Sequence, residues 1–180
     1  MENILVITGS PRKGGNSSLL ADAFIKGAQE KGHTVTRFDS AKKKIGGCIA
    51  CGKCYTGKGA CIFNDDFNEL APLVEAADMV VLATPLYWFT FPAQIKAAMD
   101  KFYAMIVGKR NIKDKQGMML VCAETHDMTD FEGIVRSWEI ICRYLEWTDK
   151  GTMLVPNVNR VGDILKTGAL KDGEALGYNL

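Results

Sequence analysis

Hydroxyl, amide and guanidinium donors are concentrated in one short segment near the amino terminus. Residues 8–18 read Thr-Gly-Ser-Pro-Arg-Lys-Gly-Gly-Asn-Ser-Ser, between a short apolar run at 4–7 and a segment of helical periodicity. A helix start presents unpaired backbone N–H groups and partial positive charge, and both favour a bound phosphate. The candidate side-chain donors are Ser10, Arg12, Asn16, Ser17 and Ser18. Phosphate binding is the predicted chemistry; the alternative is that Ser10 and Asn16 only cap and turn the chain.

The two common nucleotide motifs do not fit this segment. Gly9 and Gly14 have the spacing of a P-loop, but Gly15 and Asn16 stand where that motif needs Lys and Ser or Thr. The dinucleotide fingerprint fails as well, because Pro11 replaces its second glycine. A loop rich in hydroxyl and amide groups suits a terminal phosphate monoester, which offers many acceptor oxygens.

Four of the six cysteines are crowded into a glycine-rich segment at 46–62. They have the spacing C-x2-C-x2-C-x6-C and are Cys48, Cys51, Cys54 and Cys61. Three thiolates at three-residue steps can surround an iron-sulfur cube, so a [4Fe-4S] cluster is one interpretation. Redox-active or unused thiols are a second, and zinc is a third. Cys122 and Cys142 fall in a predicted strand and helix, where buried structural thiols are expected.

An aromatic segment, Thr84-Pro85-Leu86-Tyr87-Trp88-Phe89-Thr90-Phe91-Pro92, follows the third predicted strand. It offers a surface for a planar ring, unless its aromatic residues fill the core or a subunit interface. The candidates for a subunit contact are Phe89, Phe91 and Tyr103. After the fourth predicted strand, Ala123, Glu124 and Thr125 could close the far side of the ring with main-chain donors. We expect His126, beside them, to cap locally rather than to act as a base.

These segments follow strand-like runs that alternate with helical patterns. The strands are predicted at Ile4–Thr8, Thr34–Phe38, Met79–Ala83, Met118–Cys122 and Met153–Val155. The helices are predicted near residues 17–31, 66–77, 93–106 and 130–146, the last with Thr129 and Glu132 spaced as a capping box. This alternation predicts an α/β fold, a parallel sheet with helices on both faces. Ligands of such sheets bind outside the carboxyl ends of the strands, where the segments above should converge.

Composition narrows the classes of protein that the chain can belong to. At 180 residues it is expected to form a single domain, 1–180, with a core of ordinary size. The 22 basic and 21 acidic residues nearly cancel, so neither a nucleic-acid nor a membrane partner is expected. The first residues lack the pattern of a signal peptide, and a cytoplasmic location with reduced thiols is the default expectation.

A phosphate loop and an aromatic surface together suit a phosphorylated planar cofactor, and flavin mononucleotide (FMN) has that shape. Residues 9–17, 84–88 and 93–97 resemble the flavodoxin-like NAD(P)H-dependent FMN reductases, over roughly residues 3–155. The cysteine spacing is most similar to their iron-sulfur flavoprotein branch. The resemblance implies a three-layer sandwich with a five-stranded parallel sheet in the order 2-1-3-4-5. It implies FMN phosphate at Ser10, Arg12, Asn16, Ser17 and Ser18, and the flavin ring against residues 85–89 and 123–125.

The expected function is therefore electron transfer from NAD(P)H through bound FMN to a small-molecule or protein acceptor. No side-chain nucleophile, acid or base is nominated, because the cofactor carries the difficult step. A cluster in the cysteine loop would be expected near the flavin edge. A flavodoxin-type electron carrier and a cysteine-based redox sensor are the alternatives; the balanced charge favours the enzyme over the carrier. The resemblance also implies a homodimer or homotetramer.

Overall fold

The computed structural model describes residues 1–57 and 59–180; Lys58, within the predicted cysteine-rich loop 46–62, lies outside the described residues. A single five-stranded parallel sheet forms its centre, in the order β2-β1-β3-β4-β5. The strands are β1 (Asn3–Thr8), β2 (Thr34–Asp39), β3 (Met79–Pro85), β4 (Gln116–Cys122) and β5 (Thr148–Val155). Both the α/β class and the predicted strand order are confirmed.

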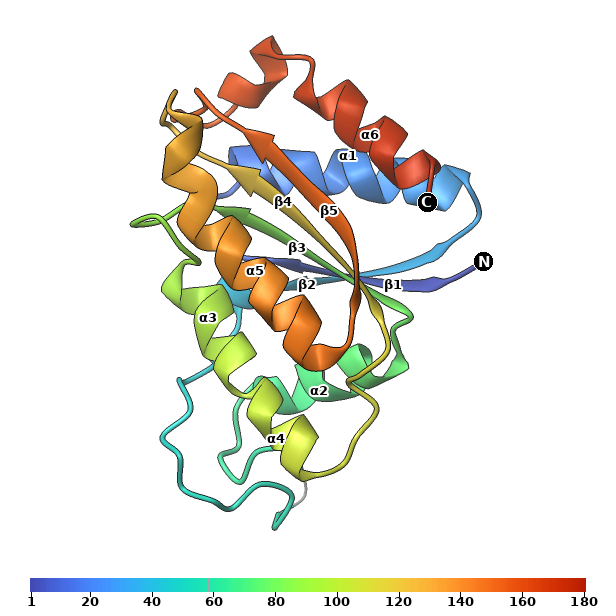
Figure 1. Ribbon diagram of the computed structural model, residues 1–180, viewed down its shortest axis with the longest axis vertical. Helices are drawn as coiled ribbons and strands as arrows, with labels where there is room; N and C mark the ends of the chain where they lie inside the picture. The colour runs from blue at the N-terminus through green and yellow to red at the C-terminus, as the bar shows by residue number, and fades with distance from the viewer. Residues whose placement is uncertain (58) are drawn as a thin grey trace.

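Helices cover both faces of the sheet, which gives three layers (Figure 1). One face carries α1 (Asn16–Glu30) and α6 (Ala169–Tyr178). The other carries α2 (Phe67–Ala76), α3 (Ala93–Asp100), α4 (Phe102–Val107) and α5 (Glu132–Leu145). In the described part of the chain, the short 3-10 helices are η1 (Ser40–Lys42), η2 (Met128–Phe131) and η3 (Asp163–Lys166).

The central strands are buried on both faces, as their unbroken apolar runs predict. Alternate residues of β1 enter two separate cores: Leu5 and Ile7 pack with α2 to α5, and Ile4 and Val6 pack with α1 and α6. Trp138 of α5 lies in the first core, edge-on to Trp147. Packing on both faces therefore fixes the sheet, and with it the positions of the carboxyl ends of the central strands.

The carboxyl-terminal helix α6, which was not predicted from the sequence, packs closely against α1. A Cβ atom at Gly27 of α1 would stand 1.9 Å from the Glu174 carbonyl oxygen, and one at Gly177 of α6 would stand 2.1 Å from the Phe24 carbonyl oxygen. No side chain fits between these backbones, so glycine is required at both contacts. Residues after Pro156 thus complete the second layer of helices.

Two predicted helices differ in their boundaries. The pattern at 93–106 forms two helices because Lys101 tightens the chain: its N–H bonds Ala98 and its carbonyl accepts from Ala104, each three residues away. The capping box before α5 is absent, because the Thr129 N–H and hydroxyl both donate to Asp127 Oδ1, at 2.9 and 2.8 Å. Asp127 instead caps η2, which leads directly into α5.

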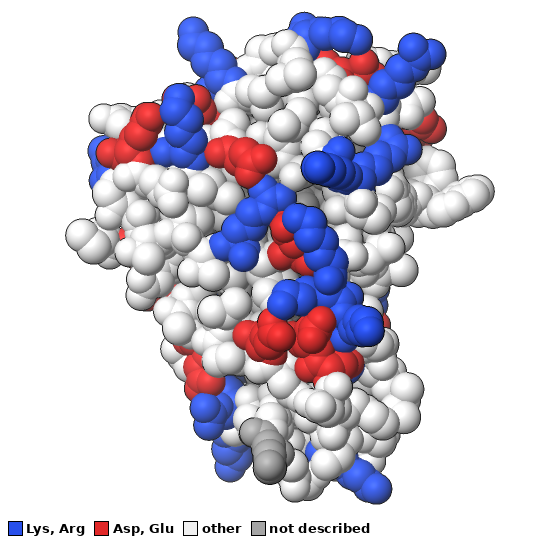
Figure 2. Space-filling view, turned by 180° about the vertical axis from the view of Figure 1, so that it is seen from behind, with Lys and Arg blue, Asp and Glu red and all other residues white. Residues whose placement is uncertain are grey.

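Acidic and basic side chains are interspersed on the face opposite to that of Figure 1, as Figure 2 shows. Several of the chain's charges form ion pairs, among them Arg37 with Asp22 and Lys43 with Glu69. Among the described residues, no helix combines the length and the apolar character needed to cross a membrane.

Candidate functional site

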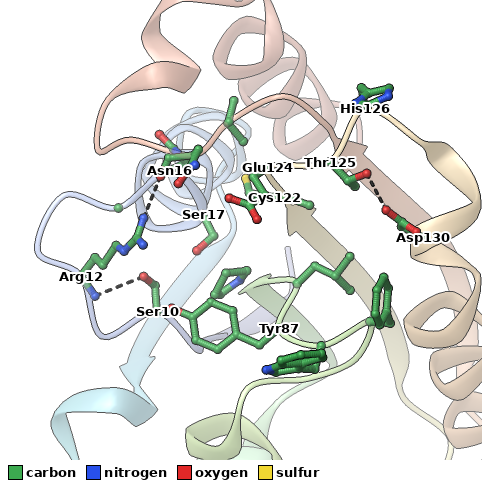
Figure 3. Close-up of a pocket in the computed structure, with 18 residues that line it drawn as sticks. Ser10, Arg12, Asn16, Ser17, Tyr87, Cys122, Glu124, Thr125, His126 and Asp130 are labelled. Carbon is green, nitrogen blue, oxygen red and sulfur yellow. Dashed lines mark hydrogen bonds between the residues drawn. The ribbon is translucent and has the colours of Figure 1, made fainter.

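A cavity of about 780 Å³ opens at the carboxyl ends of the strands, where the loops after β1, β3, β4 and β5 meet. Figure 3 shows donors of the first loop on one side, polar residues after β4 on another, and Tyr87 between them. The lining consists of Ser10, Arg12, Gly15, Asn16, Ser17, Pro85, Leu86, Tyr87, Trp88, Phe89, Cys122, Ala123, Glu124, Thr125, His126, Asp130, Val158 and Asn159. Most of the residues predicted from the sequence are therefore brought together.

The loop before α1 is compact because Gly15 has no side chain. A Cβ there would stand 2.8 Å from Ser10 Oγ and 3.2 Å from Arg12 Cβ. Arg12 curls back over this glycine, since its N–H donates to Ser10 Oγ at 3.3 Å and its carbonyl accepts from the Gly15 N–H at 3.1 Å. The result is a tight turn that delivers the chain into the first turn of α1.

Two predicted phosphate ligands also tie this loop to the chain after β5. The Asn16 amide donates to the Arg160 carbonyl at 3.0 Å and accepts from the Ile164 N–H at 3.2 Å. Arg12 Nη1 donates to the Asn159 carbonyl at 2.7 Å. Each side chain keeps further N–H groups, because a guanidinium has five donors and an amide nitrogen two. The loop is thus held from both sides before any ligand binds.

Backbone donors are available at the same place. Within residues 1–57 and 59–180, the N–H groups of Asn16 and Ser17 have no hydrogen-bond partner, as expected at the start of a helix. They stand where the positive end of the α1 dipole lies, beside the Arg12 guanidinium. This end of the cavity is suited to an anion.

Two residues of the predicted site lie outside the lining. The Ser18 hydroxyl accepts a hydrogen bond from Arg37 Nη2 at 2.7 Å, on the side of β2. Thr84 is buried beneath the loop, and its hydroxyl donates to the Pro85 carbonyl at 3.0 Å. Both side chains are engaged elsewhere in the fold.

The aromatic segment forms a hairpin turn with an unusual backbone. Tyr87 and Thr90 exchange two N–H to carbonyl bonds, of 3.0 and 3.1 Å, around Trp88 and Phe89. Both central residues are left-handed, with φ of 47° and 63°, in a turn that normally takes Asn and Gly. Trp88 is nevertheless 91% exposed. Because backbone strain of this kind concentrates at functional sites, and burial of Trp88 does not offset it, this turn is the strongest local sign of a binding surface.

The segment after β4 supplies polar groups at the other end of the cavity. Thr125 Oγ1 donates to Asp130 Oδ2 at 2.5 Å (Figure 3). Glu124 and His126 are exposed and line the cavity. The local capping predicted for His126 is performed instead by its neighbour Asp127. Burial raises the pKa of the Cys122 thiol in the cavity wall to about 12, which keeps it protonated and unreactive.

Sequence reasoning missed several lining residues. Val158 and Asn159 follow β5, and the rule that ligands lie beyond strand ends would have pointed to them. Asp130 was taken as part of a helix rather than of the site. The corrected site therefore includes four strand ends, not three.

The subunit-contact candidates separate into two kinds. Phe89 and Tyr103 are each 54% exposed. Phe91, in contrast, is only 5% exposed and belongs to the core beneath α3 and α5, so it cannot contact a neighbouring subunit. Because Phe91 stands in a segment of several aromatic residues, its burial could not be predicted from the sequence.

A second, smaller cavity of about 30 Å³ is lined by all four clustered cysteines. Cys48 and Cys51 are exposed, and Cys54 and Cys61 are half-buried; all are free thiols. Burial, followed by the proximity of the other three thiols, raises the pKa of Cys54. In the described part of the chain, no group of three or more His, Cys, Asp or Glu side chains stands in a geometry ready to hold a metal ion.

The cysteine loop is nevertheless held firmly by its neighbours. Asn68 of α2 clamps Cys61 on both sides: its Oδ1 accepts from the Cys61 N–H at 2.9 Å, and its Nδ2 donates to the Cys61 carbonyl at 3.3 Å. The Tyr55 ring packs on Gly108, where a Cβ would stand 2.3 Å from it, and beneath the Arg110 guanidinium, 5.4 Å from the ring centre. These contacts anchor the loop at Tyr55 and at Cys61.

The two cavities share no lining residue. Figure 1 shows the cysteine loop at the end of the molecule formed by α2 and α4, away from the turn that follows β3. The expectation that the loop lies beside the flavin edge is therefore not met within one chain. The reason is that residues after η1 run back along α3 and α4 instead of crossing the strand ends.

Comparisons with known proteins agree with this geometry. The family model described as NADPH-dependent FMN reductase matches residues 3–132. An iron-sulfur flavoprotein of Archaeoglobus fulgidus is 40% identical over 116 residues, which are 64% of this chain and 51% of that protein. Another, from Methanosarcina thermophila, is 33% identical over 63% of this chain and 59% of that protein. The chain thus spans little more than half the length of these relatives.

A solved structure shares the fold at low sequence identity. An NAD(P)H:quinone oxidoreductase from Methanothermobacter marburgensis superposes with a TM-score of 0.75 at 17% identity, over 99% of this chain and 95% of that chain. At this identity the match establishes the flavodoxin-like fold alone.

Proposed function

Because this chain belongs to the NADPH-dependent FMN reductase family, we propose that it is an FMN-dependent oxidoreductase that takes electrons from NAD(P)H. The observation that carries the proposal is the strand-end cavity, which combines an anion-binding helix start with a strained aromatic turn. The proposed electron acceptor is a small molecule or a protein, and no residue of the cavity selects between the two.

The cavity fits FMN in size and in chemistry. Its volume of about 780 Å³ lies within the range of cofactor sites, roughly 300–1,000 Å³. The phosphate would be held by the free N–H groups of Asn16 and Ser17, the Ser10 and Ser17 hydroxyls and the Arg12 guanidinium. The ring would lie against residues 85–89 and 123–125. When bound, FMN supplies hydride acceptance from a nicotinamide and release of electrons singly or in pairs.

The residues of the chain would bind the cofactor, orient its ring and shield the ring from water. Arg12 would neutralise charge on the phosphate, and Ser10 and Ser17 would fix it by hydrogen bonds. The phosphate end of the cofactor would then determine where the ring lies. Trp88 and Phe89 present apolar faces that exclude water from one side of the ring. The carboxylates of Glu124 and Asp130 leave negative charge at the end remote from Arg12, which opposes a second anionic group there.

The same proposal includes a [4Fe-4S] cluster at Cys48, Cys51, Cys54 and Cys61. The donor set supports it, because four thiols line one cavity, and Asn68 and Tyr55 anchor the part of the loop that carries Cys54 and Cys61. When bound, a cluster supplies storage of single electrons. The relatives named iron-sulfur flavoproteins have this group in their names, which favours a cluster over zinc.

Assembly completes the proposal. Trp88, Phe89 and Tyr103 expose large aromatic surface in a chain otherwise rich in ion pairs. Monomeric soluble proteins rarely leave such surface uncovered. A homodimer or homotetramer that covers these rings is the form we propose for the active protein.

Anaerobic purification tests the function directly. We expect flavin and iron with sulfide in the purified wild-type protein, together with steady oxidation of NADH or NADPH. Ser17→Ala should weaken FMN binding several-fold, whereas Ser137→Ala, which removes a hydroxyl from the exposed side of α5, should not. A wild-type protein that stays colourless in excess FMN would refute the proposal.

A further inference from the structure

Lys101 is a buried lysine next to the cysteine cavity. Its side chain is 4% exposed, and its ammonium forms an ion pair with Asp65, whose side chain is 17% exposed. Taking two charges out of water is costly, and replacing such a pair by apolar side chains is often neutral or stabilising. Stability alone therefore does not account for a lysine at the junction of α3 and α4.

The ion pair lies between the helices and the loop that carries the cysteines. Lys101 lines the cavity together with Cys48, Cys51, Cys54 and Cys61. Asp65 also accepts hydrogen bonds from the Gly46 N–H at 3.1 Å and the Phe67 N–H at 3.2 Å. The carboxylate thereby joins the first residue of the loop to the first residue of α2 and holds the ammonium in place.

We propose that Lys101 is the charge-compensating residue of the four-cysteine metal centre, held by Asp65 so that its ammonium stabilises the reduced centre and raises its reduction potential. The inference rests on the iron-sulfur part of the proposed function. It adds to that function a residue outside the cysteine motif that sets how readily the centre accepts an electron.

The electrostatic argument follows from the net charge. A centre ligated by four thiolates is negatively charged, and its reduction adds one electron without breaking a bond or taking up a proton. The added charge is stabilised by a nearby cation and destabilised by a nearby anion, and both effects are screened less because the Lys101 and Asp65 side chains are largely removed from solvent. Lys101 and Asp65 should therefore act on the potential with opposite signs.

This opposition of sign is the test. The wild type, Lys101→Met, Lys101→Arg, Asp65→Asn and the double variant Lys101→Met with Asp65→Asn are loaded anaerobically with iron and sulfide. Each is then titrated with dithionite while the paramagnetic signal of the reduced cluster is followed. We expect Lys101→Met to lower the potential and Asp65→Asn to raise it, each by a tenfold change in the reduction equilibrium, about 59 mV for a one-electron couple. Lys101→Arg and the double variant should stay near the wild type.

A matched lysine serves as the control. Lys96 lies on α3 and is also paired with an aspartate, Asp100, but its side chain is 51% exposed, so Lys96→Met should leave the potential unchanged. Shifts of the same sign for Lys101→Met and Asp65→Asn, or no shifts, would overturn the inference, since a purely structural pair cannot give opposite signs. If Lys101→Met retains no iron, a raised potential in Asp65→Asn supports the inference and an unchanged one overturns it. A wild type that binds no iron overturns both the proposed cluster and this inference. A wild type that binds iron, with variants that show no opposite shifts, overturns this inference alone.

Discussion

The strand-end cavity and the cysteine cavity are built in contrasting ways. The first draws its walls from four loops far apart in the sequence, three of which follow β1, β3 and β4, strands that are buried on both faces. The second comes from one contiguous loop and one helix, and a few contacts hold it: Asn68 on Cys61, Tyr55 on Gly108, and Asp65 with Lys101. The first site is thus placed by the whole fold, whereas the second depends on local anchors and can be changed separately.

Removal of two cysteines is expected to have the largest effect and to separate the two regions completely. Cys51→Ser combined with Cys54→Ser should abolish iron binding, because a four-iron cluster needs four thiolates. FMN affinity should be unchanged, since the cavities share no residue. Iron, sulfide and flavin analysis measures both, with Cys142→Ala, a buried thiol of α5, as the control. Iron retained by the double variant would contradict the ligand assignment.

A substitution at Gly15 should affect the strand-end cavity and leave the cysteine cavity unchanged. Gly15→Val places a side chain against Ser10 Oγ and Arg12, although the backbone φ of −62° suits any residue. We expect FMN affinity to fall at least tenfold, about 1.4 kcal/mol, while iron content is retained. Fluorescence titration with FMN measures this. Gly168→Ala, at a glycine outside the cavity where a Cβ meets only Asp172 at 3.9 Å, should bind FMN normally. Equal losses in both variants would exclude a local effect.

The strained turn should show opposite effects on stability and binding. Trp88→Asn with Phe89→Gly provides the residues that a turn with two left-handed positions prefers. The free energy of unfolding should rise by roughly 1–2 kcal/mol, because a non-glycine residue in this conformation costs about that much. FMN affinity should fall several-fold through loss of the aromatic surface. Thermal unfolding without FMN and titration with FMN give the two results. Unchanged affinity would remove these rings from the site.

The smallest effect is expected at Asp39, which lines neither cavity and lies at the end of β2, where it accepts a hydrogen bond from the Thr8 hydroxyl of β1 at 2.7 Å. Burial alone would raise the pKa of Asp39, but hydrogen bonds from Lys42, Thr8 and Arg37 outweigh it and lower the pKa from 3.8 to about 2. The resulting stabilisation, at most about 1 kcal/mol because solvent screens these charges, is present above pH 3.8 and is lost as the pH falls through about 2. Asp39→Asn should therefore be less stable than the wild type at pH 6 and equal to it near pH 2 in urea unfolding. A difference independent of pH would contradict this account.

The sequence predicted features that repeat or that follow general rules of topology. The strands, their order and most of the cavity lining were accessible because apolar runs and strand ends have recognisable patterns. The resemblance to FMN reductases and to their iron-sulfur flavoprotein branch is likewise confirmed. Ser18 was misplaced because adjacent residues at a helix start point to different sides, and only the fold shows that Arg37 takes its hydroxyl.

Features that depend on contacts distant in sequence were not accessible. The break at Lys101 is marked by backbone hydrogen bonds three residues apart, and Lys101 pairs with Asp65, 36 residues away; helical periodicity reveals neither feature. The bonds from Asn16 to Arg160 and Ile164 join residues that are 144 and 148 positions apart. The position of the cysteine loop depends on its docking against α2 and α4, and its internal spacing contains no information on where it docks.

The close contact of α6 with α1 has a consequence for how the molecule responds to its cofactor. No residue of α6 lines the strand-end cavity, yet Asn16 begins α1 and also binds the Ile164 N–H of η3, which precedes α6. A ligand that immobilises Asn16 must therefore make detachment of the carboxyl-terminal segment less favourable, by the linkage between binding and local opening. Amide hydrogen exchange in α6 should slow as FMN is added, so that the far end of the chain reports on occupancy of a site it never touches.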